Sequence, residues 1–89
     1  MSNTIKTQIQ TFFVTRGWKL TPFGHLTNVL SNGKKYRVYF QATSVKWEVG
    51  VDYENGEYGW VRLETTYYSK IKFLEDGRLV AFGKVFKWN

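Results

Sequence analysis

Residues 30–40, LSNGKKYRVYF, combine a turn signal with an alternating strand. Asn32-Gly33 is a dipeptide that accepts the left-handed backbone of a tight two-residue hairpin turn. The residues after it alternate between apolar and polar side chains, which is typical of a half-buried β-strand. The same turn chemistry recurs twice further along the chain, at Asn55-Gly56 and Asp76-Gly77. The sequence therefore predicts three consecutive antiparallel hairpins.

The turns and the valine- and aromatic-rich stretches between them set the strand limits. We expect six strands, at about residues 25–30, 34–43, 45–53, 57–64, 67–74 and 78–88, the last one broken or bulged at Gly83. The pleat places alternate residues on opposite faces, so Lys35, Arg37 and Tyr39 share the polar face of their strand. Six strands in so short a chain must bend, and we expect a strongly curved sheet or a partial barrel.

An amphipathic helix is predicted before the strands, over about residues 3–16. Apolar residues recur at helical spacing along it, at Ile5, Ile9, Phe12 and Phe13. Gly17 is a natural C-terminal cap, and residues 18–24 are expected to form a connector. The predicted fold class is α+β, with the helix packed on an antiparallel meander of five to six strands.

Composition limits the organisation of the chain. Its 89 residues have room for one domain, 1–89, with one small core. Cysteine is absent, which excludes disulfides and thiolate metal sites, and 19% of the residues are aromatic. No apolar run is long enough for a signal peptide or a membrane span, so we expect no membrane partner and a cytoplasmic location. Oligomeric state does not follow from these features.

Charge is segregated along the chain, which has a net charge of +6. The first 47 residues contain basic side chains and no acid, whereas all seven acids lie between Glu48 and Asp76. We expect a molecule with a positive side and an acidic hairpin tip around Asp52, Glu54 and Glu57. Such a charge distribution favours nucleic acid or an acidic protein surface as the partner.

Two groups of basic and aromatic residues are candidates for nucleic-acid binding. The first is Lys34, Lys35 and Arg37 with Tyr39, and the second is Lys70 and Lys72 with Tyr68. Cations that neutralise phosphates beside rings that stack on bases are typical of proteins that hold single strands or RNA. The alternative for both groups is a solvated strand face whose lysines discourage edge-to-edge aggregation.

A second set of residues indicates a different class of function. Aromatic rings beside an arginine are typical of protein-interaction hot spots, and the third and fourth strands carry such a set: Tyr53, Tyr58, Trp60 and Arg62. The alternative function is therefore a protein-interaction or inhibitor module that docks through these side chains. The structural alternative is a rim of rings that closes a small core.

Signatures of catalysis, metals or cofactors are lacking in the sequence. His25 is the only histidine, and no nucleophile elbow or phosphate loop occurs. The expected hairpin register sets Glu64 opposite Trp47 and Glu48 opposite Leu63, so that these two carboxylates point to different faces. We therefore expect a small non-enzymatic binding module without a metal or a cofactor.

Overall fold

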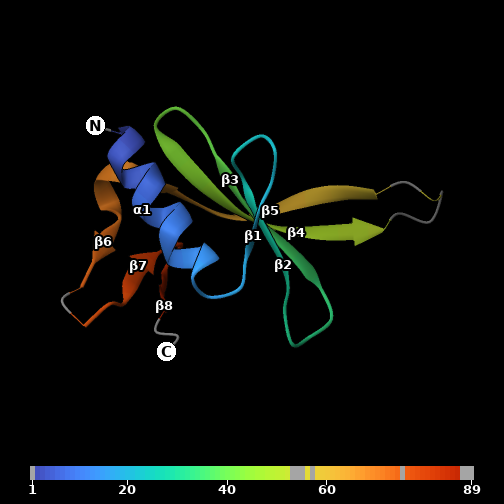
Figure 1. Ribbon diagram of the computed structural model, residues 1–89. Helices are drawn as coiled ribbons and strands as arrows, with labels where there is room; N and C mark the ends of the chain where they lie inside the picture. The colour runs from blue at the N-terminus through green and yellow to red at the C-terminus, as the bar shows by residue number, and fades with distance from the viewer. Residues whose placement is uncertain (1, 53–55, 57, 75, 87–89) are drawn as a thin grey trace.

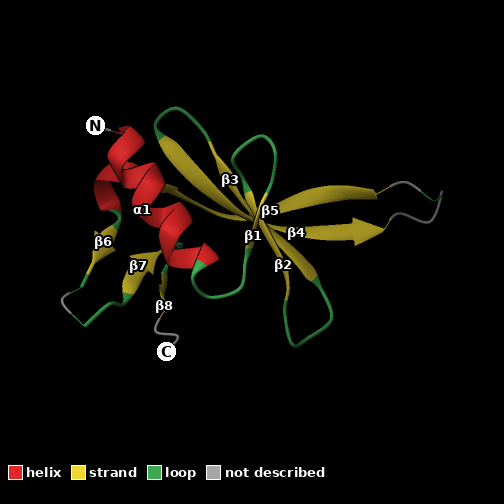
Figure 2. Ribbon diagram, in the orientation of Figure 1, coloured by secondary structure: helices red, strands yellow, loops and turns green. Residues whose placement is uncertain are grey.

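The computed structural model describes residues 2–52, 56, 58–74 and 76–86. It is an α+β fold in which one helix accompanies two antiparallel sheets (Figures 1 and 2). The elements, in chain order, are α1 (Ser2–Val14), β1 (Lys19–Leu20), β2 (Leu26–Val29), β3 (Lys35–Phe40), β4 (Ser44–Asp52), β5 (Tyr58–Tyr67), the 3₁₀ turn η1 (Tyr68–Lys70), β6 (Lys72–Phe73), β7 (Leu79–Ala81) and β8 (Lys84–Phe86).

The helix α1 ends at Val14, and Gly17 and Trp18 cap its C-terminus. Gly17 takes a left-handed φ of 95°, and its N–H donates to the carbonyl of Val14 at 3.1 Å. The N–H of Trp18 donates to the carbonyl of Phe13 at 3.0 Å. These two bonds form a Schellman motif, which satisfies carbonyls that the end of a helix leaves free. The predicted glycine cap is confirmed, and the helix ends two residues earlier than expected.

The first sheet has the strand order β1-β2-β3-β4-β5. Its first strand corrects the sequence prediction, which placed residues 18–24 in a connector. Leu20 instead pairs with Leu26, because the chain reverses in a tight turn between them. The N–H of Thr21 closes that turn on the carbonyl of His25 at 2.7 Å. Pro22 favours the first central position of such a turn, and this signal marks a hairpin rather than a linker.

The Asn32-Gly33 hairpin is confirmed, but its loop is one residue longer than a two-residue turn. The N–H of Leu30 donates to the carbonyl of Lys34 at 3.0 Å, which leaves three residues in the loop. Gly33 has a φ of 80°, as a type I turn followed by a left-handed glycine requires. The Asp76-Gly77 hairpin has the same closure, from the N–H of Leu74 to the carbonyl of Arg78 at 2.8 Å.

The β4–β5 hairpin contains a bulge that changes the expected register. Glu64 lies opposite Trp47, as predicted. Glu48, however, pairs with Arg62, and the register shifts between Trp47 and Glu48. Leu63 is therefore the extra residue, and the prediction that it lies opposite Glu48 was wrong. A bulge of this kind bends a strand and re-aims its side chains.

The last third of the chain forms its own three-stranded sheet, in the order β6-β7-β8. It is separate because the chain turns through η1 after β5, which interrupts the single strand predicted at residues 67–74. The predicted break at Gly83 is confirmed, since Phe82 and Gly83 both have positive φ angles, of 56° and 67°. The described strands do not close into a barrel.

One hydrophobic core joins the helix and both sheets. Phe13 is at its centre, fully buried, and its ring contacts those of Trp18 and Phe86 with centroid distances of 5.0 and 5.6 Å. Trp47 of the first sheet contacts Phe82 and Phe86 of the second, each at 5.6 Å. In Figure 1 the helix and the second sheet lie together on one side, and the β4–β5 hairpin extends away from them. In the described part of the chain, no helix has the length and apolarity needed to cross a membrane.

Candidate functional site

The face of the first sheet opposite the core is polar and aromatic. Val38 and Trp47 pair across β3 and β4 with buried side chains, so the residues that alternate with them point to the other side. We call that side the outer face. Register assigns to it Lys19, Thr27, Lys35, Arg37, Tyr39, Lys46, Glu48, Asp52, Tyr58, Trp60 and Arg62.

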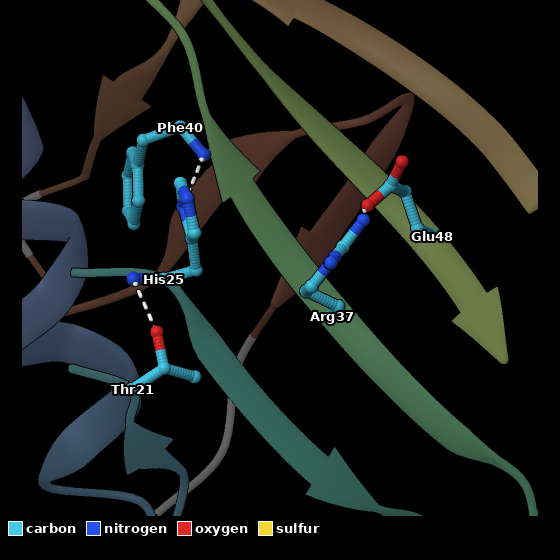
Figure 3. A network of polar contacts seen from close by, with 5 residues as sticks. All are labelled: Thr21, His25, Arg37, Phe40 and Glu48. Carbon is cyan, nitrogen blue, oxygen red and sulfur yellow. Dashed lines mark hydrogen bonds and ion pairs between the residues drawn. The ribbon is translucent and has the colours of Figure 1, made fainter. Parts of the chain in front are cut away.

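An ion pair lies at the centre of the outer face. Nε of Arg37 donates to Oε1 of Glu48 at 2.7 Å, between neighbouring strands (Figure 3). Their side chains are only 22% and 9% exposed. The short Gln41–Ser44 turn sets this pairing, since the N–H of Gln41 donates to the carbonyl of Ser44 at 2.8 Å and fixes the β3–β4 register. Arg37 is thus positioned by a carboxylate that also neutralises it.

Planar side chains extend from this ion pair in both directions. On one side the Cζ of Arg37 lies 4.7 Å from the ring of Tyr39, which stacks on His25 at a centroid distance of 4.1 Å. On the other side Cζ lies 4.4 Å from the ring of Trp60, which meets Tyr58 edge-to-face at 5.7 Å. We call these five residues the aromatic–cation row. It crosses the sheet from β5 to the start of β2.

A glycine on β4 makes room for one end of the row. Gly50 pairs with Trp60, and the hydroxyl end of Tyr58 occupies the space where a side chain on Gly50 would start. A larger residue at position 50 would displace the Tyr58 ring. The hydroxyl end of Tyr58 therefore lies over the β4 backbone, in a position that only glycine leaves open.

At the other end of the row, His25 is held as a neutral imidazole. Its Nδ1 accepts a hydrogen bond from the backbone N–H of Phe40 at 3.0 Å, and the backbone N–H of His25 donates to Oγ1 of Thr21 at 3.0 Å (Figure 3). An imidazole can accept at Nδ1 only when that nitrogen is unprotonated. Burial lowers the pKa of His25 below its ordinary value of 6.5, and the nearby charges of Arg37 and Lys6 lower it further, while Glu48 raises it.

This environment predicts a loss of stability at mildly acidic pH. The unfolded chain takes up a proton on His25 below about pH 6.5, whereas the folded chain resists it until its lower pKa is reached. The free energy of unfolding should therefore fall as the pH drops from 7 toward 5. Urea unfolding of the wild type and of His25→Asn, which cannot be protonated, measures this term. The prediction fails if both proteins lose stability equally over that interval.

Cations without a carboxylate partner surround the row. Within the described residues, the outer face carries four basic side chains that form no ion pair: Lys19, Lys35, Lys46 and Arg62. The carboxylates that register places on this face are Glu48, which is engaged by Arg37, and Asp52. Among the described residues, basic charge therefore exceeds acidic charge on the outer face and favours a positive field there. Glu54 and Glu57 of the expected acidic tip lie outside the described residues.

The structure brings together residues that the sequence assigned to competing functions. Arg37 and Tyr39 belong to the first nucleic-acid group, and Trp60 with Tyr58 belongs to the protein-interaction set, yet all four lie in one row. Arg62 and Lys35 share their face, and Lys34 is exposed in the adjoining turn. Tyr53 lies outside the described residues.

The second nucleic-acid group lies elsewhere. Tyr68 is 9% exposed, and its hydroxyl donates to the carbonyl of Gln41 at 2.7 Å, so its ring offers no surface to a base. Burial raises the pKa of this phenol above its ordinary value. Lys70 and Lys72 are exposed, but they follow Tyr68 beyond the Phe40 end of β3. The six-residue length of β3, about 20 Å, separates them from Lys34 and Lys35.

Sequence reasoning missed two members of the site, Glu48 as a partner of Arg37 and His25 as a stacking ring. A signal for the first was present, because a two-residue turn at Ala42-Thr43 sets Gln41 opposite Ser44 and hence Arg37 opposite Glu48. The second required the β1–β2 turn, which places His25 beside Tyr39.

An open groove of about 770 Å³ lies between α1, the β3–β4 turn and η1. Its lining is mainly apolar and includes Ile5, Tyr67 and Ile71, with no acid or histidine among its residues. In the part of the chain that the structure describes, no three histidine or acidic side chains come together as metal ligands would. The candidate site is the outer face, where aromatic rings and basic side chains come together.

Comparisons with other proteins add no functional assignment. No protein-family model matches the chain, and no curated protein or solved structure matches it.

Proposed function

We propose that this protein is a small, non-enzymatic binding module that holds single-stranded nucleic acid, RNA included, on its outer face. The observation that supports the proposal is the aromatic–cation row, a line of planar groups beside lysines that form no ion pair with any residue the structure describes. Rings of this kind stack on unpaired bases whatever their sequence, and the cations neutralise the phosphates between them. The cytoplasm is the compartment that we propose for this role.

On this face, different residues would make the stacking contacts and the phosphate contacts. Trp60 and Tyr58 offer their rings from β5, where Tyr58 is half exposed. Lys35 and Lys46 lie beside the row on β3 and β4 and have no carboxylate partner within the described residues. Loss of a ring should therefore weaken stacking, whereas loss of the lysines should weaken the salt-dependent part of binding.

A titration with labelled oligothymidylate, oligouridylate and duplex DNA at two salt concentrations tests the proposal. We expect the single strands to bind at low salt, with an affinity that falls by a slope of about −0.7 per phosphate neutralised. Trp60→Ala should weaken binding about tenfold, because one base loses its stacking partner. Lys35→Glu/Lys46→Glu should reduce both the affinity and the salt slope.

The chain offers a matched control for the charge change. Lys70→Glu/Lys72→Glu alters the net charge by the same amount, at exposed positions away from the outer face. This variant should keep most of the affinity. The proposal is contradicted if wild-type protein binds no oligonucleotide at low salt, or if the control pair loses as much affinity as the pair on the outer face.

A protein-interaction module is the second candidate, and one observation favours it. Trp60 packs on the guanidinium of Arg37 beside Tyr58, the residue composition of a protein hot spot. Docking of a protein through these rings would be comparatively insensitive to salt and specific for one partner. The same salt series separates the two candidates, because phosphate binding must weaken steeply as salt is added.

A further inference from the structure

The turn between β1 and β2 carries a solvent-exposed phenylalanine, Phe23. Phe23 is 84% exposed, the highest value among the large apolar side chains that the structure describes. It lies between Pro22 and Gly24 at the tip of the turn. A ring that projects from the tip of a turn in this way is accessible to another molecule, and contact with an apolar or aromatic group would remove it from water.

The turn that carries Phe23 is tightly held. The N–H of Gly24 donates to the carbonyl of Thr21 at 2.9 Å, and Gly24 has a φ of 86° that favours glycine. The side-chain amide of Gln10, on α1, donates to the carbonyl of Gly24 at 2.9 Å. Thr21 closes the turn on His25 through both its backbone and its hydroxyl. Because the backbone is already ordered, binding at Phe23 costs little conformational entropy.

The surroundings of the turn indicate the charge of the molecule that would cover it. Nζ of Lys6 lies close to Gly24, at 3.5 Å from the position of a Cβ there, and also 5.5 Å from the ring of Phe40. In the described residues Lys6 has no carboxylate partner, and the first 47 positions of the sequence contain no acid at all. An occupant that offers both a planar apolar group and a negative charge fits this site, and a nucleotide has both.

We propose that Phe23 extends the aromatic–cation row and stacks on one further unpaired base, next to the His25 end, while Lys6 neutralises the adjoining phosphate. This inference rests on the proposed function and adds the direction in which the strand continues: past His25 and over the β1–β2 turn. A strand long enough to cover the row and the turn should bind more tightly than one that covers the row alone.

The test uses oligothymidylates of about four to twelve nucleotides that carry the fluorescent base 2-aminopurine at the 5′ end, the 3′ end or the centre. We expect Phe23→Ala to weaken the longest oligonucleotide about tenfold and to leave the shortest unchanged. The fluorescence change of the reporter at one end should be lost in this variant and kept at the centre. Phe23→Trp should restore both signals. The control is Phe73→Ala, which removes a partly exposed phenylalanine from the second sheet.

Failure of this inference differs from failure of the proposed function. If wild-type protein binds the long oligonucleotides and Phe23→Ala binds them equally well at every length, the role of Phe23 is overturned and the outer-face site remains. If wild-type protein binds none of them at low salt, the proposed function itself is overturned. Equal losses in Phe23→Ala and Phe73→Ala also overturn the inference, since they indicate a general effect on the fold.

Discussion

Replacing Arg37 with methionine should lower the free energy of unfolding by about 3 kcal/mol. The reason is that Glu48, whose side chain is 9% exposed, loses the guanidinium 2.7 Å away that compensates its charge. A buried carboxylate without a partner costs more than the ion pair contributes, because desolvation is no longer offset. The measurement is the urea midpoint and slope at neutral pH.

A double-mutant cycle separates the interaction energy of the Arg37–Glu48 pair from the cost of losing each side chain alone. Glu48→Gln should cost less than Arg37→Met, because the remaining guanidinium is 22% exposed and still contacts the rings of Tyr39 and Trp60. The double variant Arg37→Met/Glu48→Gln should be more stable than the sum of the single losses indicates. The control is Arg78→Met, which breaks an ion pair on exposed side chains and should leave the midpoint almost unchanged.

The same variants report on binding as well as on stability. Glu48→Gln removes the charge that neutralises Arg37, so it should tighten oligonucleotide binding even though it lowers stability. A merely structural pair would not tighten binding when it is broken. If Arg37→Met and Arg78→Met shift the urea midpoint equally, the Arg37–Glu48 pair contributes no more than an exposed ion pair, which contradicts its burial.

The hairpins were predictable because their signals are local. The turns that Asn-Gly and Asp-Gly form need a glycine in the left-handed conformation. Gly33 and Gly77 adopt this conformation, with φ angles of 80° and 84°. The helix end followed from Gly17 for the same reason. Loop length was not predictable from the dipeptide, since a glycine with this conformation serves two-residue and three-residue loops alike.

The outer-face site depended on contacts that are distant in sequence. Its assembly needs β5 beside β4 in a register that the bulge at Leu63 alters. No glycine, proline or asparagine at this position signals the bulge in the sequence. Alternation along β3 correctly placed Arg37 and Tyr39 on one face. It could not show that Trp60, from a different hairpin, lies 4.4 Å from the same guanidinium. The sequence identified these residues one by one as candidates, but it could not show that they contact one another.

The core prediction with the largest effect is at Phe13, which is 0% exposed. Phe13→Ala should lower the free energy of unfolding by about 4 kcal/mol, because it removes a buried ring and leaves a cavity between helix and sheets. In a chain of this length the melting temperature should fall by roughly 20 °C. If this variant is too unstable to purify, Phe13→Leu, with a smaller loss of volume, should show the same effect at about a third of the size.

The residue next to Phe13 in sequence provides the control. Val14 is 44% exposed on the same helix, and Val14→Ala should leave stability unchanged or slightly raised, since alanine has the higher helix propensity. The Phe13 ring contacts Trp18 at the helix end and Phe86 on β8, so its loss weakens the helix and the second sheet together. Unfolding followed by tryptophan fluorescence and by circular dichroism should therefore still occur in one transition. Two separate transitions, or equal losses at positions 13 and 14, would contradict a single core shared by the helix and both sheets.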